Sequence, residues 1–297
     1  MLEELIRFTA DEEDAGHTVR EVLQKRYGVS RRLLVRAKFK GLITRNGQHV
    51  FVNETLGAGD EIVVMVAQEE TEAVPPEEMP LAIRYEDDDF MVIAKPAGLV
   101  VHPTGNHPGG TLANGVIAYW QKRGEQRKFR AVNRLDKDTS GLLIVAKNQW
   151  AHEQFSRMQQ ERSLQRIYQA VAEGIVEPDE GTIDAPIGLA ENSFITRQIR
   201  PDGQPAVTHF RVLARGNGHS FVELKLETGR THQIRVHMSH CGHPLAGDDL
   251  YGGQRIWIGR QALHASRLSF AHPRTGELHE WVEPLPKDMK QLLDRMQ

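Results

Sequence analysis

The sequence has little of what marks a secreted, membrane-bound or disulfide-stabilised protein. Cys241 is the only cysteine among 297 residues, which excludes an intramolecular disulfide and any Cys-x-x-Cys site and fits a reducing compartment. No stretch approaches the roughly 20 apolar residues that a membrane-spanning helix needs. The N-terminal stretch MLEELIRFTADEEDAG is acidic and interrupted by charges, unlike a signal peptide. We therefore expect a cytoplasmic protein that makes no membrane contact.

The common short motifs for nucleotide and metal binding are also missing. The Gly- and Pro-rich stretch 95–116 contains neither Gly-x-x-x-x-Gly-Lys nor Gly-x-Gly-x-x-Gly, so it predicts a rigid loop, with His102 at its rim, and no phosphate-binding loop. Four histidines crowd the later stretch 232–243, but their spacing matches no zinc pattern and no His-Glu-x-x-His is present. Packing, or hydrogen bonds to RNA or backbone, is the simpler explanation for them. We expect neither a metal nor a cofactor.

Charge is distributed unevenly along the chain. The net charge of −3 argues against indiscriminate binding to polyanions. Between residues 20 and 45, however, only Glu21 is acidic, whereas nine residues are basic: Arg20, Lys25, Arg26, Arg31, Arg32, Arg36, Lys38, Lys40 and Arg45. Residues 69–89 show the reverse, with nine acidic side chains and Arg84 as the single basic one. This asymmetry favours a nucleic-acid surface in the N-terminal part of the protein.

The N-terminal part has the pattern of a small helix–helix–hairpin module. Apolar residues recur at helical spacing in TVREVLQKRY, and Ser30 is placed to cap a second helix, RRLLVRAKFK, that Gly41 ends. An Asn-Gly pair then predicts a hairpin, and EIVVMV predicts a final strand. We assign residues 1–66 to an RNA-binding domain with its core at 17–66. Its expected RNA contacts share the outward face of the second helix: Arg31, Arg32, Arg36 and Lys40.

A linker and a larger domain follow. Residues 67–80 are acidic, contain three prolines and show no periodicity, which predicts a flexible linker. From 81 to 297, short strand patterns recur, and helical patterns are present at 111–123, 148–161, 231–240 and 286–296. Most of these strands are connected by turns and do not alternate strictly with helices. We therefore expect an α+β domain with a mixed, largely antiparallel sheet and flanking helices.

One candidate for chemistry is the stretch AVNRLDKDTSGLLIVAKN, where charged residues immediately precede an apolar run that predicts a buried strand. Asp136 is open to two interpretations. It could be a turn residue that caps the strand, or a carboxylate held by the guanidinium of Arg134, as a nucleophile or base would be. Asp138 and Thr139 already supply the turn chemistry, which favours the second interpretation. Ser140 lacks the Gly-x-Ser-x-Gly elbow of a hydrolase nucleophile.

The other candidate is ETGRTHQIRVHMSHCGHPLAGDDLYG, residues 227–252. A predicted strand ends at Thr228, and Thr231 can cap the helix that follows. Arg230 would therefore lie at a strand-to-helix junction, from which its side chain can project into a cleft. Tyr168 falls on another predicted strand, where the pattern alone is explained by a core aromatic residue.

Together these stretches closely resemble the RluA-like, large-subunit-type pseudouridine synthases. The likeness runs from about Leu81 to Pro286, and its motifs stand in family order: KPAGLVVHP, NRLDKDTSGLLIVAKN, ERSLQRIYQAVAEG, LETGRTHQIRVHMSHCGHPLAGDDLYG and LHASRLSFAHP. Residues 17–66 are similar to the S-four-type RNA-binding domain that often precedes this catalytic domain. The resemblance implies a cofactor-free isomerase that converts specific uridines of structured RNA into pseudouridine.

The resemblance also implies roles for individual residues. Asp136 matches the essential catalytic aspartate, Tyr168 the active-site tyrosine, and Arg230 the basic residue that pairs with the aspartate. Arg134 matches the arginine that helps to hold the flipped-out nucleotide, a conformation that costs about a few kcal/mol of unstacking. Asn133 departs from the pattern, because many members have histidine there. Whether Asp136 attacks the anomeric carbon or removes a neighbouring proton stays open at this point.

The two-domain layout favours ribosomal RNA as the substrate, although transfer RNA is an alternative, and we expect a monomer. A non-catalytic RNA-binding assembly factor would show a broken Asp–Tyr–Arg set, whereas all three positions are filled here. A glycoside or ester hydrolase that used Asp136 would need a second carboxylate as its acid. Asp138, the nearest one in sequence, is already explained as a turn residue.

Overall fold

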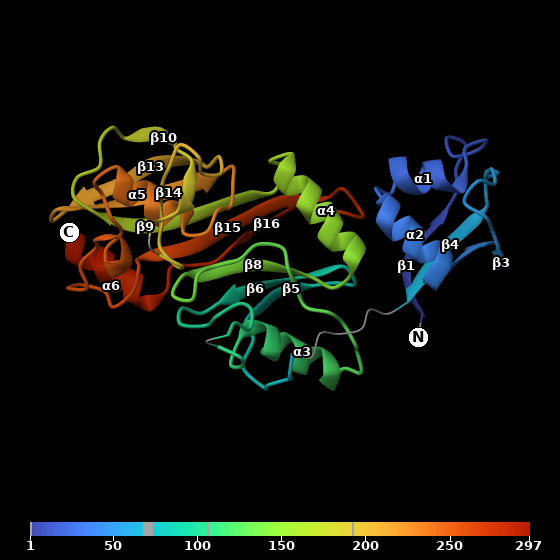
Figure 1. The fold of residues 1–297 in the computed structure, drawn as a ribbon, viewed down its shortest axis with the longest axis horizontal. Helices are drawn as coiled ribbons and strands as arrows, with labels where there is room; N and C mark the ends of the chain where they lie inside the picture. The colour runs from blue at the N-terminus through green and yellow to red at the C-terminus, as the bar shows by residue number, and fades with distance from the viewer. Residues whose placement is uncertain (1, 68–73, 106, 192) are drawn as a thin grey trace.

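The N-terminal part is a four-stranded sheet with two helices against it, at the blue end of the chain in Figure 1. The computed structural model describes residues 2–67, 74–105, 107–191 and 193–297. The elements of the N-terminal part are β1 (Leu2–Thr9), α1 (Val19–Lys25), α2 (Arg31–Lys40), β2 (Gly41–Arg45), β3 (Gln48–His49) and β4 (Glu61–Ala67). The strand order is β1-β4-β2-β3, and β1 pairs antiparallel with β4. We did not predict β1, because the charged residues on its exposed side obscure the buried Leu5, Ile6 and Phe8.

The ends of α1 and α2 follow from local chemistry. Thr18 and Glu21 form a capping box at the start of α1, which satisfies backbone amides that have no partner inside the helix. Ser30 accepts a hydrogen bond from the Leu33 amide at 3.1 Å, which confirms the predicted cap of α2. Gly41 begins β2 directly after the helix, where a Cβ would collide with the Met65 carbonyl. The close approach of α2 to the sheet therefore depends on this glycine.

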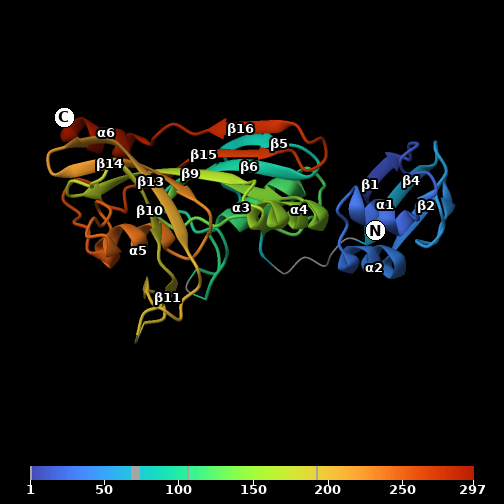
Figure 2. The ribbon, with the colours of Figure 1, turned by 90° about the horizontal axis from the view of Figure 1, so that it is seen from above.

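The larger part contains a mixed ten-stranded sheet, which confirms the predicted α+β fold class. Its strands are β5 (Ile83–Glu86), β6 (Phe90–Lys95), β7 (Arg130–Ala131), β8 (Ser140–Ala146), β9 (Gln165–Glu173), β10 (Glu180–Asp184), β13 (Val207–Gly216), β14 (His219–Leu226), β15 (Leu263–Ala271) and β16 (Leu278–Val282). The main order is β10-β13-β14-β9-β15-β8-β6-β5. Among the described residues, only the β8–β15 ladder is parallel. A separate hairpin of β11 (Ile187–Leu189) and β12 (Arg197–Ile199) projects from the sheet in Figure 2.

Four helices lie where helical patterns predicted them, within one or two residues at each end. They are α3 (Leu112–Lys122), α4 (Gln149–Gln160), α5 (Gln233–His240) and α6 (Lys287–Met296). In Figure 1, α3 and α4 lie on opposite sides of β6 and β8. Met91 and Ile93 accordingly join the apolar cluster that includes α3, whereas Phe90 and Val92 join the cluster that includes Phe155 of α4. Both strands are fully buried and mostly apolar because both of their faces are covered.

Residues 74–80 are packed in place, contrary to the prediction of a free linker. The Asn114 amide donates to the Pro75 carbonyl at 2.8 Å, and the Gly110 amide donates to Glu77 Oε2 at 2.8 Å. These bonds hold the segment against α3 and the loop that precedes it. Packing of the larger domain therefore begins at residue 74 and not at 81. The other residues of the expected linker, 68–73, lie outside the described part of the chain.

The N-terminal domain is docked on α4, a contact that the flexible linker predicted from the sequence did not lead us to expect. Trp150 Nε1 donates to the Tyr27 carbonyl at 2.7 Å, and Gln154 Nε2 donates to the Gly28 carbonyl at 3.0 Å. Trp150 and Ala151 are members of the same buried apolar cluster as the core of the N-terminal domain. An apolar contact reinforced by side-chain-to-backbone hydrogen bonds favours one relative orientation of the two domains.

Within the described residues, no helix has the length and apolar character needed to cross a membrane.

Candidate active site

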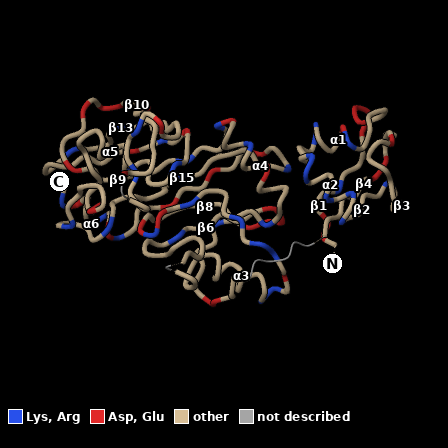
Figure 3. The backbone as a smooth tube through the Cα atoms, viewed as in Figure 1, with Lys and Arg blue, Asp and Glu red and all other residues tan. Residues whose placement is uncertain are grey.

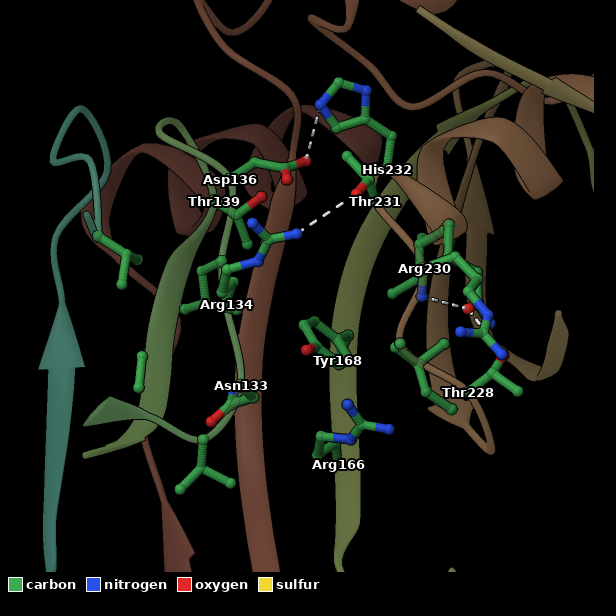
Figure 4. Close-up of a pocket in the computed structure, with 18 of the residues that line it drawn as sticks. Asn133, Arg134, Asp136, Thr139, Arg166, Tyr168, Thr228, Arg230, Thr231 and His232 are labelled. Carbon is green, nitrogen blue, oxygen red and sulfur yellow. Dashed lines mark hydrogen bonds and ion pairs between the residues drawn. The ribbon is translucent and has the colours of Figure 1, made fainter. Parts of the chain in front are cut away.

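A pocket of about 850 Å³ opens between three stretches that are far apart in the sequence. They are the loop before β8, the segment from the end of α4 into β9, and the turn between β14 and α5. These stretches meet because β9 lies between β14 and β15 in the sheet, and β15 pairs with β8. The sheet thereby brings Asp136, Tyr168 and the 227–235 segment to one cavity (Figure 4).

Asp136 is held by an arginine that the sequence analysis did not single out. Arg235, on α5, donates from Nη1 to Asp136 Oδ2 at 3.1 Å. The same guanidinium makes a two-pronged bond to the fully buried Asp248, with both distances at 2.7 Å. Burial alone would disfavour the charged guanidinium, but the ion pairs with Asp248 and Asp136 outweigh it and raise the pKa of Arg235. The site therefore presents Asp136 to the pocket beside a permanently charged partner.

The predicted ion pair between Arg230 and Asp136 is wrong. Arg230 is exposed and donates from Nε to the Pro205 carbonyl at 3.0 Å, and Figure 4 shows it directed away from Asp136. The predicted cap at Thr231 is wrong as well, because the N-cap is His232, in a left-handed conformation with φ of 59°. Delaying the helix start to Gln233 places Arg235 in its first turn, facing Asp136. The stretch GRTHQIR, residues 229–235, contains both arginines, so the sequence already offered Arg235 as a second candidate partner for Asp136.

His232 is a second neighbour of Asp136 that the sequence analysis did not place in the site. Its Nε2 lies 3.9 Å from Asp136 Oδ2, and its Nδ1 lies 2.7 Å from the Tyr251 hydroxyl. That hydroxyl accepts a bond from the Arg197 amide and is free to donate to Nδ1, an arrangement that leaves the imidazole proton on Nε2, facing Asp136. Burial lowers the pKa of His232, although Asp136 opposes the shift, so the neutral ring is favoured at neutral pH.

Tyr168 and Arg134 border the pocket at different depths. Tyr168 lies on β9 with only 5% of its surface exposed, and burial raises the pKa of its phenol, so the hydroxyl stays protonated. Arg134 is exposed at the mouth, where its Nη2 lies 3.5 Å from Thr231 Oγ1. Figure 4 shows the guanidinium between Asp136 and Tyr168. The two residues thus offer an aromatic wall and an exposed cation next to the carboxylate.

Two buried residues fix the loop that carries Asp136. Asn133 accepts a hydrogen bond from the Ile144 amide at 2.9 Å, which anchors the loop to β8. Lys95 donates from Nζ to three carbonyls, those of Pro96 at 2.9 Å, Leu99 at 2.7 Å and Lys137 at 2.8 Å. Burial lowers the pKa of Lys95 to about 7, against the opposing effect of Asp138 and Asp136. Lys95 therefore ties the Asp136 loop to the end of β6.

The sequence and the fold match one family. Residues 89–240 match the profile of the RNA pseudouridylate synthases. The chain belongs to this family. It is 47% identical over 268 residues to the RNA pseudouridine synthase YjbO of Bacillus subtilis, covering 90% of this chain and 95% of that protein. The ribosomal large subunit pseudouridine synthase D of Neisseria meningitidis is 44% identical over 268 residues, covering 86% of this chain and 71% of that protein.

Solved structures agree with this assignment. The human RNA pseudouridylate synthase domain containing 1 has a TM-score of 0.57 and 29% identity, covering 77% of this chain and 97% of that structure. The protein is therefore an RNA pseudouridine synthase, an enzyme that isomerises uridine within RNA. This confirms the family, the fold class and the reaction expected from the sequence motifs.

The four basic residues predicted on α2 as RNA contacts differ in their exposure to solvent. Arg31, Arg32 and Lys40 are exposed, and Figure 3 marks the Lys and Arg positions of α2 in blue. Arg36 is half-buried and donates to Gln149 Oε1 of α4 at 2.8 Å, as well as to the Ala67 carbonyl. It contributes to the docking of the N-terminal domain, so three of the four predicted cations remain as an outward-facing set.

Proposed function

We propose that the enzyme isomerises specific uridines of large-subunit ribosomal RNA and that Asp136 is its catalytic carboxylate. The observation that carries the catalytic role is the placement of Asp136 at 3.1 Å from Arg235, at the edge of a pocket that Tyr168 also lines. The choice of RNA is supported by the relative named a ribosomal large subunit pseudouridine synthase and by the exposed cations of α2. Transfer RNA is the alternative substrate, and a cytoplasmic monomer remains our prediction.

The reaction needs one bond broken and one bond made at the same sugar carbon. The bond between N1 of uracil and C1′ of ribose breaks, the base turns within the pocket, C5 bonds to C1′, and the proton on C5 is lost while N1 gains one. No electrons are exchanged with a second reactant. The base must first leave its stack, and Arg134 at the mouth is placed to occupy the vacated space or to grip the backbone.

Each wall of the pocket then has a part in the proposed chemistry. Asp136 acts at the ribose, either by attack on C1′ or by removal of a neighbouring proton, and the hydrogen bond from Arg235 holds the carboxylate in position. Tyr168 supports the uracil ring while it is detached, and its hydroxyl assists the loss of the C5 proton. The base has to stay bound between the two bond events, and the ring of Tyr168 in the pocket wall is placed to hold it there.

The direct test is Asp136→Asn, assayed on an unmodified transcript of bacterial large-subunit ribosomal RNA. We expect no pseudouridine from the variant, while RNA affinity stays within roughly tenfold of the native value, or about 1.4 kcal/mol. Asp202→Asn is the matched control, because Asp202 is exposed and pairs with Arg200 outside the pocket. Substantial product from Asp136→Asn would exclude the assignment. Native activity on transfer RNA transcripts alone would move the substrate to the alternative class.

A further inference from the structure

Arg166 is a buried cation without a partner in the wall of the active-site pocket. It stands on β9 two residues before Tyr168, so both side chains lie on the same face of the strand, and Figure 4 shows them one below the other. Only 7% of its surface is exposed. Across the described part of the chain, its guanidinium has no hydrogen bond or ion pair, and Nε is shielded from solvent without an acceptor.

This state is unusual among the buried arginines of the protein. Arg235 is compensated by Asp248 and Asp136, and Arg260 is compensated by Asp288 at 2.7 Å. An arginine remains charged at any physiological pH, and a buried charge without a counter-charge is costly. A structural role would have been better served by an apolar residue. The buried guanidinium of Arg166 therefore points to a ligand that supplies the missing acceptor.

The surroundings of Arg166 leave the pocket side open for that ligand. On one side the guanidinium lies against the backbone of Gly229, where a Cβ would stand 2.7 Å from Nη1. Glu227, the carboxylate of the adjoining turn, is already occupied by His209 at 2.7 Å and Arg162 at 2.6 Å. No described residue of the turn thus provides an anion for Arg166. The pocket is the remaining direction from which one can arrive.

We infer that Arg166 binds a backbone phosphate of the RNA, at a linkage next to the flipped uridine. The inference rests on the proposed function, in which the uridine lies between Asp136 and Tyr168. A uracil carbonyl would leave most of the positive charge uncompensated, whereas a phosphate offers a full charge and two oxygens in the geometry of a guanidinium fork. Arg166 is one pleat, roughly 7 Å, along the strand from Tyr168, so the phosphate lies beside the base and not on it.

The position of Arg166 also gives the RNA a direction. Beyond it, the pocket is lined by Ser156, Gln159 and Gln160 at the end of α4. The opposite end of α4 carries Gln149 and Trp150, which contact the N-terminal domain. A phosphate held at Arg166 leads the strand from the catalytic carboxylate toward this helix and the exposed cations of α2. Arg166 is thus a positioning residue that orients the backbone for the reaction.

The test combines a charge removed from the protein with a charge removed from the RNA. The probe is a short synthetic hairpin around a uridine that the native enzyme has been shown to modify in large-subunit ribosomal RNA, with one linkage at a time replaced by an uncharged methylphosphonate. Affinity is measured on the Asp136→Asn background, which does not turn over. Arg166→Gln is compared with Arg166→Lys, and Arg211→Gln is the control, because Arg211 is exposed and pairs with Glu223 outside the pocket.

At one linkage beside the target uridine, we expect the methylphosphonate to weaken RNA binding to the protein with Arg166 by about tenfold. In Arg166→Gln, the same methylphosphonate should leave RNA affinity unchanged, because the charge that contacts this linkage is already missing. Arg166→Lys should retain part of the sensitivity, and Arg211→Gln should retain all of it. The melting temperature of unliganded Arg166→Gln should equal or exceed that of the parent protein, because an unpaired buried charge has been removed. A lower melting temperature would indicate a structural arginine instead.

The inference is overturned if, at every linkage, Arg166→Gln and the methylphosphonate reduce RNA affinity independently, so that the combined fold-change is the product of the two separate fold-changes. It is also overturned if Arg166→Gln, introduced into the otherwise native enzyme, lowers kcat alone with RNA affinity unchanged, which would place Arg166 against the uracil. Failure of the native enzyme to modify any large-subunit RNA is a separate result, detected before the hairpin is made, and it rejects the proposed substrate.

Discussion

Arg235 joins two carboxylates of different exposure, Asp136 in the pocket and Asp248 in the interior. The buried Asp248 takes two hydrogen bonds from the guanidinium and fixes its plane, which leaves Nη1 directed at Asp136. The Cζ atom of this guanidinium also lies over the ring of Tyr251, 4.9 Å from its centre. The ion pair that matters to the chemistry is thus oriented by a second ion pair that never contacts the pocket.

This relationship predicts different outcomes for the two arginines of the GRTHQIR motif. Arg235→Gln leaves Asp248 buried without a counter-charge and Asp136 without its ion pair, so we expect a loss of roughly 3 kcal/mol in stability and at least about a thousandfold in single-turnover rate. Arg235→Lys should recover only part of the rate, because a lysine cannot bridge both carboxylates in the same way. Arg230→Gln is the matched comparison, and a loss as severe as that of Arg235→Gln would contradict our description of the site.

Two variants of Tyr168 can separate its role in supporting the detached uracil from a role in removing the C5 proton. Tyr168→Phe keeps the ring against the pocket and removes a hydroxyl that burial keeps protonated. If the hydroxyl assists proton loss from C5, the rate should fall by about 10² to 10³, with RNA affinity little changed. Tyr168→Ala should lose both rate and affinity. Equal rates for Tyr168→Phe and the native enzyme would restrict the residue to a packing role.

The exposed cations of α2 should govern the salt dependence of RNA binding. Each phosphate contact contributes about 0.7 to 0.9 to the slope of log affinity against log salt concentration. The combined variant Arg31→Gln, Arg32→Gln, Lys40→Gln should therefore flatten this slope while turnover on saturating RNA is largely kept. An unchanged slope would exclude α2 as an RNA-binding surface.

The docked N-terminal domain gives Trp150 a specific role. Trp150→Ala removes an apolar contact and the bond to the Tyr27 carbonyl, so the domain should detach from α4 while each part stays folded. We expect faster cleavage of the protein by limited proteolysis and a lower affinity for the natural RNA. Trp281→Ala, within the larger domain, is the control for loss of a tryptophan. Unchanged proteolysis in Trp150→Ala would mean that other contacts suffice for docking.

Lys95 should make stability depend on pH in the alkaline range. Burial lowers its pKa from 10.5 to about 7, so between these values the unfolded chain binds a proton that the folded chain does not. Stability should therefore rise with pH across this window, by at most about 1.4 kcal/mol per pH unit from this group. Lys95→Met should abolish that rise and lower the baseline, because the carbonyls of Pro96, Leu99 and Lys137 lose their donor group. Denaturant unfolding of both proteins from pH 7 to 10 measures the difference, and parallel curves would contradict the prediction.

Local patterns accounted for much of the fold. The four helices of the larger domain were predictable because their apolar periodicity and their end residues are encoded within a dozen neighbouring positions. The strands β6 and β8 were predictable because burial on both faces makes nearly all of their residues apolar. In contrast, β1 was missed, since the charged residues Glu3, Glu4 and Arg7 interrupt its apolar pattern, and β16 was missed because only its pairing with β15 makes it a strand.

The sequence by itself determined the chemical identity of the site: the motifs that contain Asp136, Tyr168 and two arginines are recognisable before any folding is considered. It could not decide which arginine meets the carboxylate. Asp136 and Arg235 are 99 positions apart, and their contact depends on the register of the sheet and on a left-handed residue that delays the start of α5. Nor could a local pattern show that Arg166 is buried without a counter-charge. Such facts depend on which distant groups share a volume, and only the tertiary structure sets that.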